Sequence, residues 1–211
     1  MSSKFSSDVA QVEALERRRA APASTNLSLV DEGTANGDVR SLFAHYRERF
    51  ARTDVPGIVL CFATNSVLLK GMLEIAENFL FSESLLSRRH KEMIATYVSQ
   101  QNACLYCADS HGAMLGVQGG LSEMICSLQR GDLNAQLFTG AELALLKFVE
   151  KVNANSSAVI RADVEAAMRA GWTEPQVAEA VHVVALYAAF NRIANGFGLP
   201  SPYADSLRDK L

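Results

Sequence analysis

The sequence predicts an all-α protein, a helical bundle of about seven or eight helices, and three observations support this. From Ser41 onward, apolar residues recur at intervals of three and four, which is the spacing of one face of an α-helix. Helix start and stop signals follow one another along the same region. No stretch of the 211 residues alternates apolar and polar side chains as a half-buried strand does.

An N-terminal extension, residues 1–40, precedes the predicted bundle. It is rich in Ser, Ala, Gly, Asp and Asn, and we expect a short charged helix at about residues 8–19 and a linker at residues 20–38. The extension is expected to be partly disordered or to contact another subunit. Residues 41–211 are expected to form a single helical domain.

The first three helices of this domain are predicted from their apolar stripes. One begins at Ser41 and ends before Pro56-Gly57, a helix-breaking pair. The next two cover about residues 64–81 and 85–101. The stripe of the first helix comprises Leu42, Phe43, Tyr46 and Phe50. The inward stripe of the second is expected to comprise Val67, Leu68, Gly71, Met72, Ile75 and Phe79. The buried edge of the third is expected to comprise Met93, Ile94, Tyr97 and Val98.

Boundary signals place the remaining helices. One starts near Ala103 and stops at Gly119-Gly120, and a short helix covers residues 121–129. Thr139 and Glu142 have the spacing of a capping box. The last three helices are expected at residues 139–153, from about Asp163 to Gly171, and from the capping residue Thr173 to about Gly196.

Charge and hydropathy argue against two classes of partner. The net charge is −3, so we expect no nucleic-acid partner and no attraction to an anionic membrane surface. The N-terminus lacks the apolar core of a secretory signal. The longest apolar run, near residues 177–190, contains Glu179 and His182, and it is expected not to span a membrane. A cytoplasmic location is therefore expected. His182 itself is expected to be a histidine buried in the core.

Residues 87–118, SRRHKEMIATYVSQQNACLYCADSHGAMLGVQ, concentrate the reactive side chains of the chain. Cys104 and Cys107 lie at a predicted helix start, where the helix dipole favours a thiolate and lowers a thiol pKa from about 8.5. His111 follows Cys107 by one helical turn and can take its proton. Glu92 reaches the same face if the two helices pack antiparallel, and it can then orient the imidazole. These four residues predict a dithiol redox centre.

Other interpretations of these residues remain open. Two cysteines, one histidine and one glutamate could bind zinc, although structural zinc sites usually draw ligands from two separated knuckles. The cysteines could also be ordinary buried residues. Haem attachment is excluded, because it requires histidine directly after the second cysteine, where Ala108 stands. The other two cysteines, Cys61 and Cys126, are expected to be small buried residues.

The pattern of Glu92, eleven residues, Cys104-Leu-Tyr-Cys107, three residues and His111 resembles the alkylhydroperoxidase D-like family of the carboxymuconolactone decarboxylase superfamily. Gly119 and Phe190-Asn191-Arg192 are similar to its peroxidase-related branch. The resemblance covers about residues 41–200, and it implies an all-helical fold, oligomers and thiol peroxidase activity. The decarboxylase members of the superfamily lack the cysteine pair, so that activity is not expected here.

The resemblance implies a role for each motif residue. Cys107 corresponds to the peroxidatic thiol and Cys104 to the resolving thiol, while His111 and Glu92 correspond to the proton relay. The best-known members carry a histidine between the two cysteines, and this chain has Tyr106, whose phenol could hydrogen-bond a peroxide oxygen.

We therefore expect a thiol-dependent peroxidase or disulfide reductase. Its substrate would be a peroxide, its reductant an external dithiol, and its assembly a homo-oligomer. No flavin or nicotinamide motif is present in the sequence, and no cofactor or metal is expected. Tyr106 and Asn191 are expected in the substrate pocket, with Tyr187 on the same helix face as Asn191. The alternative is a non-enzymatic redox sensor or an oligomeric binding protein on the same scaffold.

Overall fold

The fold is all-α, as the sequence predicts. The computed structural model describes residues 24–202, which contain helices and no strands. The α-helices are α2 (Gly37–Phe50), α3 (Gly57–Phe62), α4 (Ser66–Ile75), α5 (Arg88–Gln101), α6 (Leu105–Val117), α7 (Ser122–Arg130), α8 (Gly140–Asn155), α9 (Arg161–Arg169) and α10 (Glu174–Phe197). A π-helix, η1 (Ala76–Leu80), continues α4, and a short 3-10 turn, η2 (Ser156–Ala158), follows α8. The helix expected at residues 8–19 lies outside the described residues.

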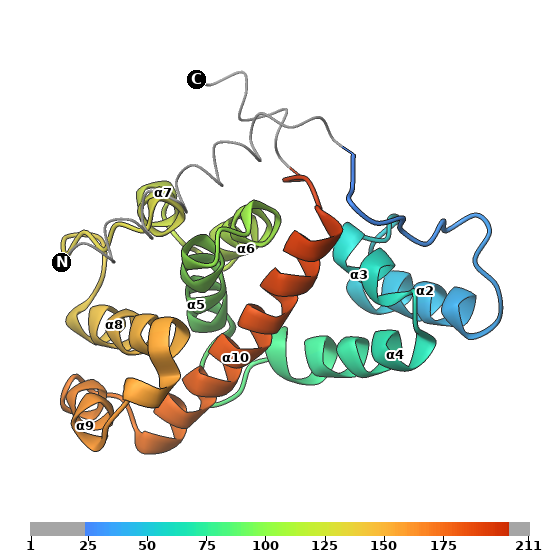
Figure 1. The fold of residues 1–211 in the computed structure, drawn as a ribbon. Coiled ribbons are helices and arrows are strands. Elements are labelled where there is room, and N and C mark those ends of the chain that lie inside the picture. The colour runs from blue at the N-terminus through green and yellow to red at the C-terminus, as the bar shows by residue number, and fades with distance from the viewer. Residues whose placement is uncertain (1–23, 203–211) are drawn as a thin grey trace.

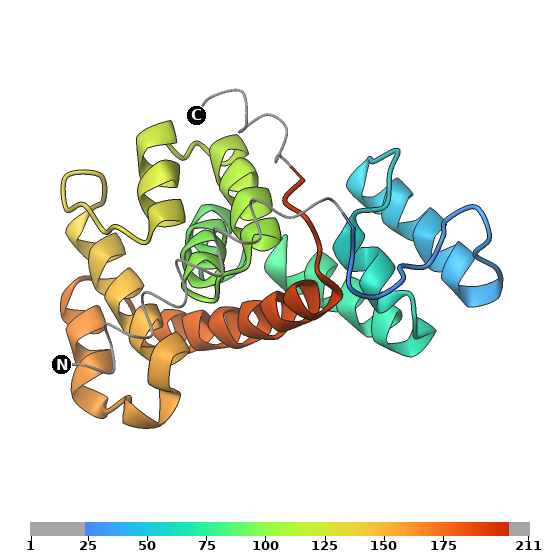
Figure 2. The ribbon, with the colours of Figure 1, turned by 45° about the horizontal axis from the view of Figure 1, so that its top comes forward.

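Helix α10 divides the molecule into two groups of helices (Figures 1 and 2). Helices α5 to α9 lie on one side of it and α2 to α4 on the other. Each group has its own apolar core, and a small third cluster lies where α3, α6 and α10 meet. This third cluster contains Cys61, Cys104, Tyr106, Cys107, Ala194 and Leu199. The two motif cysteines therefore lie at the junction of the two groups.

The ends of α10 follow from local sequence signals. Thr173 forms a capping box with Gln176, Pro175 occupies the first turn, and Gly198 ends the helix with a φ of 73°. Within the described part of the chain, α10 is the helix with the length and apolar composition of a membrane span. It is longer than the run at residues 177–190, yet its buried side chains pack against α5 and α8, as in the core helix of a globular protein.

Helix α5 is buried on every side, whereas the sequence predicts only one buried edge. All residues from Lys91 to Ser99 are buried, including the charged Lys91 and Glu92. Buried polar groups are tolerated when they are paired. Thr96 Oγ1 donates to the carbonyl of Glu92 at 2.8 Å, and Ser99 Oγ accepts from Asn191 at 2.9 Å. This central position lets α5 contribute to chemistry on more than one face.

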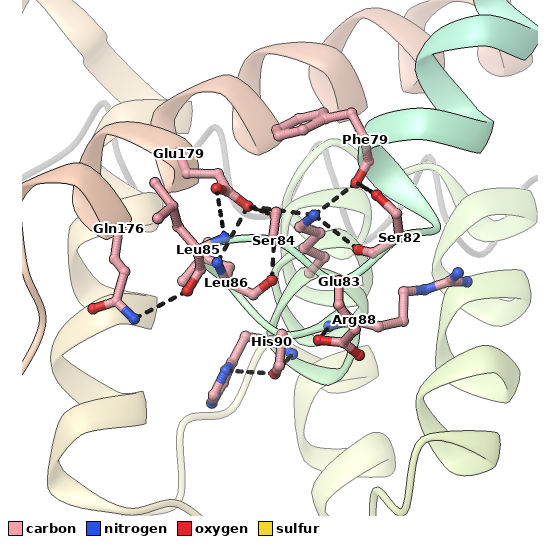
Figure 3. Close-up of polar contacts among 12 residues, drawn as sticks. Phe79, Ser82, Glu83, Ser84, Leu85, Leu86, Arg88, His90, Gln176 and Glu179 are labelled. Atoms are coloured by element: carbon pink, nitrogen blue, oxygen red, sulfur yellow. Dashed lines mark hydrogen bonds and ion pairs between the residues drawn. The ribbon is translucent and has the colours of Figure 1, made fainter.

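The segment between η1 and α5 is fastened by the ion pair of Lys91 and Glu179. Lys91 Nζ lies 3.3 Å from the Glu179 carboxylate and donates to the carbonyls of Phe79 and Ser82 at 2.6 and 3.0 Å. The Glu179 carboxylate also accepts hydrogen bonds from the Ser84 hydroxyl and from the backbone amides of Leu85 and Leu86 (Figure 3). Residues 84–86 are thereby tied to α10, and Ser82 is tied to Lys91 on α5.

Several expectations from the sequence are wrong. The inward stripe of α4 is Leu69, Met72 and Leu73, while Val67, Leu68 and Ile75 are exposed. Asn65 caps the helix by accepting from the amides of Val67 and Leu68, so the helix begins two residues later than expected, and η1 then shifts its register. Two single residues also differ, because Cys126 and His182 are exposed rather than buried. Helix α2 begins at Gly37, before the expected boundary at Ser41.

Candidate active site

The turn between α5 and α6 places the first cysteine. Asn102 ends α5, Ala103 adopts a left-handed conformation with a φ of 51°, and Cys104 begins α6. The amide of Cys104 donates to the Ser99 carbonyl at 2.9 Å, and the amide of Ala103 donates to the Gln100 carbonyl at 3.0 Å. This pair of bonds is a Schellman motif, so the end of one helix and the start of the next share Cys104.

Replacing Ala103 by glycine should stabilise this turn. An L-residue in the left-handed region is strained, and glycine removes the strain at some cost in unfolded-state entropy, for a net gain of about 0.5–1 kcal/mol in the free energy of unfolding. Urea unfolding followed by circular dichroism measures the change. Ala113→Gly, on the exposed side of α6, is the matched control and should lose stability because glycine weakens a helix interior. A stability loss in Ala103→Gly would contradict the geometry described.

Cys107 lies in the first turn of α6 beside Cys104, and both are buried. Their thiols are hydrogen-bonded, and this bond together with burial raises the pKa of Cys107 well above its ordinary value. The Asn191 amide hydrogen-bonds the same thiol and acts in the opposite direction. The expectation that the helix start lowers this pKa is therefore wrong for Cys107, because burial outweighs the helix dipole.

Asn191 connects the thiol to the surrounding helices. Its Nδ2 donates to Ser99 Oγ at 2.9 Å, and its Oδ1 accepts from Asn102 Nδ2 at 3.0 Å. Asn195, one turn further along α10, donates to the Asn102 carbonyl at 3.1 Å. The structure thus brings Asn191 to Cys107, and a chain of amides holds the α5–α6 turn against α10.

Glu92 and His111 form a close pair across α5 and α6. His111 Nδ1 and Glu92 Oε2 are 2.6 Å apart, and Glu92 is fully buried. Arg88 Nε donates to the other carboxylate oxygen at 2.6 Å, so the buried carboxylate has a charged partner as well. With Nδ1 engaged by Glu92, Nε2 of His111 is the nitrogen able to exchange a proton within the site. The antiparallel return of Glu92 to this face is thus realised.

A cavity of about 350 Å³ opens onto these residues. Cys107, His111, Tyr106 and Tyr187 line it from α6 and α10. Its other wall is mostly apolar and comes from the opposite group of helices, with Val55, Ile58, Val59, Met72, Leu73, Ala76, Leu80 and Phe81. The cavity therefore lies between the two groups, with the thiol and the imidazole on one wall.

The two tyrosines that line the cavity from α6 and α10 differ in their partners. The Tyr106 oxygen accepts from the amide of Ile58 at 3.2 Å, and burial raises the pKa of Tyr106 well above its usual range. Tyr187 packs edge-to-face against the His111 ring, with ring centres 4.6 Å apart. Sequence reasoning placed Tyr187 and Asn191 on one face of the last helix, and the structure brings both of them to the motif.

Two residues at the candidate site, Arg88 and Cys61, were not expected there from the sequence. Arg88 stands four residues before Glu92, a spacing that signals an ion pair on a helix. Cys61 is buried in the same cluster as the cysteine pair, but nothing in its local sequence indicates this. Among residues 24–202, no three His, Cys, Asp or Glu side chains gather as ligands for a metal ion.

The reactivity of Cys107 should rise steeply with pH. Since its pKa is raised above the ordinary value, the thiolate fraction at neutral pH is small and grows about tenfold per pH unit. Alkylation of Cys107 by iodoacetamide, followed by mass spectrometry at this site, should therefore accelerate from pH 7 to pH 9 without a plateau. The exposed Cys126 serves as an internal reference for the reagent. A plateau at or below pH 8 would show that the thiol ionises more easily than its surroundings indicate.

Comparison with known proteins bears on this geometry. The carboxymuconolactone decarboxylase family matches residues 68–151, which span the motif from before Glu92 to beyond His111. A comparison with functionally curated proteins gave no match. The similarity to this family thus covers the region from α4 to α8.

Solved structures share the fold of this chain. An alkylhydroperoxidase AhpD core from Ralstonia eutropha, described as an uncharacterized peroxidase-related protein, has a TM-score of 0.73 and 22% identity over 87% of this chain and 95% of its own. An uncharacterized peroxidase-related protein from Silicibacter has a TM-score of 0.71 and 22% identity over 84% and 93%. A protein of unknown function from Agrobacterium tumefaciens, a candidate antioxidant defence protein AhpD, has a TM-score of 0.59 and 23% identity over 66% and 93%.

Proposed function

We propose that this AhpD-like protein is a thiol-dependent peroxidase that uses Cys107 as the attacking thiol and Cys104 as the resolving thiol. The observation that carries the proposal is the pairing of His111, which lines the same cavity wall as Cys107, with the fully buried Glu92 behind it. A base held in place by a carboxylate beside a nucleophile is the arrangement expected around an activated thiol. The structural neighbours named as peroxidase-related proteins support the same reaction class.

Because the pKa of Cys107 is raised, the proposed mechanism needs a base that removes the thiol proton. A thiol that keeps its proton must lose it before it can attack, and Nε2 of His111 is the available acceptor on the same helix. The Cys107 sulfur then attacks the terminal peroxide oxygen and becomes a sulfenic acid, and an alcohol or water leaves. The Cys104 thiol condenses with the sulfenic acid, which forms a disulfide and releases one water.

An external dithiol completes the proposed cycle. It attacks the disulfide, leaves as a disulfide itself, and restores both protein thiols. The cycle needs no flavin, nicotinamide or metal. We further propose that the protein works as a homo-oligomer in the cytoplasm and that it belongs to the peroxidase-related branch.

The alternative is a redox sensor that oxidises once, and the burial of both sulfurs favours it because a sheltered disulfide is slow to be reduced. A coupled assay separates the two functions. Purified protein receives hydrogen peroxide or tert-butyl hydroperoxide with excess dithiothreitol, and a matched sample receives peroxide alone. An enzyme consumes many equivalents of peroxide with the reductant and one equivalent without it. Consumption of a single equivalent in both samples would identify a sensor, and mass mapping should locate the bridge between Cys104 and Cys107.

A further inference from the structure

The hydroxyl of Tyr187 is a buried polar group without a partner. Tyr187 is 1% exposed, and among residues 24–202 its hydroxyl is the buried side-chain oxygen or nitrogen that makes no hydrogen bond. Buried tyrosine hydroxyls almost always have a partner, because an unpaired one has lost its hydrogen bonds to water. Such a group indicates a site that a ligand completes.

The position of Tyr187 shows where that ligand would lie. The residue lines the cavity together with Cys107 and His111, and its ring packs against the imidazole. Burial raises the pKa of the Tyr187 hydroxyl well above its ordinary value, and the charges of Glu92 and Cys107 add to this effect while Arg88 opposes it. The hydroxyl therefore lies within electrostatic reach of both the relay and the thiol, and it keeps its proton at neutral pH.

Tyr106 is less suited to the same task, although the sequence directs attention to it first. Its oxygen accepts from the backbone amide of Ile58 at 3.2 Å, so the hydroxyl is held at the start of α3 even though its proton is not used in that bond. The Tyr187 hydroxyl, by contrast, has its donor and acceptor capacity unused within the described residues. Of the two phenols on the same wall as Cys107, Tyr187 is the one placed to bind an incoming oxygen.

We propose that Tyr187 donates a hydrogen bond to the peroxide oxygen that leaves as Cys107 attacks. The inference rests on the proposed peroxidase function and adds a catalytic residue to it. In this step the Cys107 sulfur forms a bond to the terminal oxygen of R–O–O–H while the O–O bond breaks, and the electron pair of that bond goes to the inner oxygen. Tyr187 stabilises the negative charge that develops there. The proton lost by the thiol reaches this oxygen through His111, which gives Cys107–S–O–H and R–O–H.

Tyr187→Phe tests the assignment, because it removes only the hydroxyl. Stopped-flow measurement of Cys107 oxidation by hydrogen peroxide and by tert-butyl hydroperoxide should show a loss of about 10- to 100-fold in the second-order rate constant. Alkylation of Cys107 by iodoacetamide at the same pH should stay within about twofold, since that reaction has no peroxide oxygen to stabilise. The thermal midpoint should stay the same or rise, because the unpaired hydroxyl contributes no hydrogen bond to the fold.

Tyr97→Phe is the matched control. Tyr97 is buried on α5 outside the cavity lining and hydrogen-bonds Gln101 and Glu150, so its loss should leave the peroxide rate unchanged. A wild-type peroxide rate in Tyr187→Phe would overturn the inference alone. An equal loss of alkylation and peroxide rates would also overturn it, because it would show that the residue only positions the thiol. A wild-type protein whose Cys107 is not oxidised by peroxide would instead overturn the proposed function.

Discussion

Cys107→Ser should lower the rate of peroxide consumption by at least about a thousandfold, because a serine hydroxyl is a far weaker nucleophile towards peroxide than a thiolate. Cys107 lines the cavity beside the Glu92–His111 pair, whereas Cys104 is fully buried behind it at the start of α6. Stopped-flow measurement with excess dithiothreitol records the loss. Cys126→Ser, which changes an exposed thiol on α7, is the matched control and should turn over as the wild type does.

The resolving thiol gives a different signature. Cys104→Ser should still react once with peroxide and then accumulate a sulfenic acid at Cys107, which a dimedone adduct reveals by mass spectrometry. Multiple turnover in Cys107→Ser would remove this residue from the attacking role. A sulfenic acid trapped at Cys104 in that variant would show that the two roles are reversed.

The largest loss of stability is expected from Lys91→Met. Removing one partner of a buried ion pair leaves an unpaired charge, which costs about 3–5 kcal/mol in the free energy of unfolding. Lys91 is fully buried, and it holds the Glu179 carboxylate and the carbonyls of Phe79 and Ser82. Urea unfolding monitored by circular dichroism measures this change.

The double variant shows whether the pair acts as a unit. Lys91→Met combined with Glu179→Gln should lose less stability than the sum of the two single variants. Each single variant leaves one buried charge unpaired, whereas the double variant removes both charges. Lys151→Met is the matched control, because Lys151 pairs with Asp163 on the surface, and it should be much less destabilising. Equal losses in Lys91→Met and Lys151→Met would mean that the buried pair does not hold the segment at residues 82–86.

Signals that act within one turn of helix are readable from the sequence. The capping boxes at Thr139 and Thr173 mark the starts of α8 and α10 correctly. The stripe of α4 is misjudged because it depends on one capping side chain, Asn65, and on the π-helical register that follows. The burial of α5 is misjudged for another reason, since Lys91 pairs with Glu179, a residue far away in the chain.

The same difference between local signals and long-range contacts applies to the candidate site. The spacing of Cys104, Cys107 and His111 places them on one helix, and the return of Glu92 needs only the packing of neighbouring helices. Asn191 reaches the thiol from α10, and only a three-dimensional arrangement shows that contact. The direction of the Cys107 pKa shift is misjudged from the motif alone, because the dipole of a helix start is a local effect and burial is not.

Cys104 and Cys107, the proposed redox pair, are both sheltered, with exposed fractions of 0% and 4%. Reduction of a disulfide requires an incoming thiolate to collide with one of its sulfurs. A folded oxidoreductase presents its cysteine on a broad surface, which cannot enter a space of about 350 Å³. Large reductants are therefore sterically excluded. A small dithiol should reduce the disulfide faster than a folded protein that has the same reduction potential.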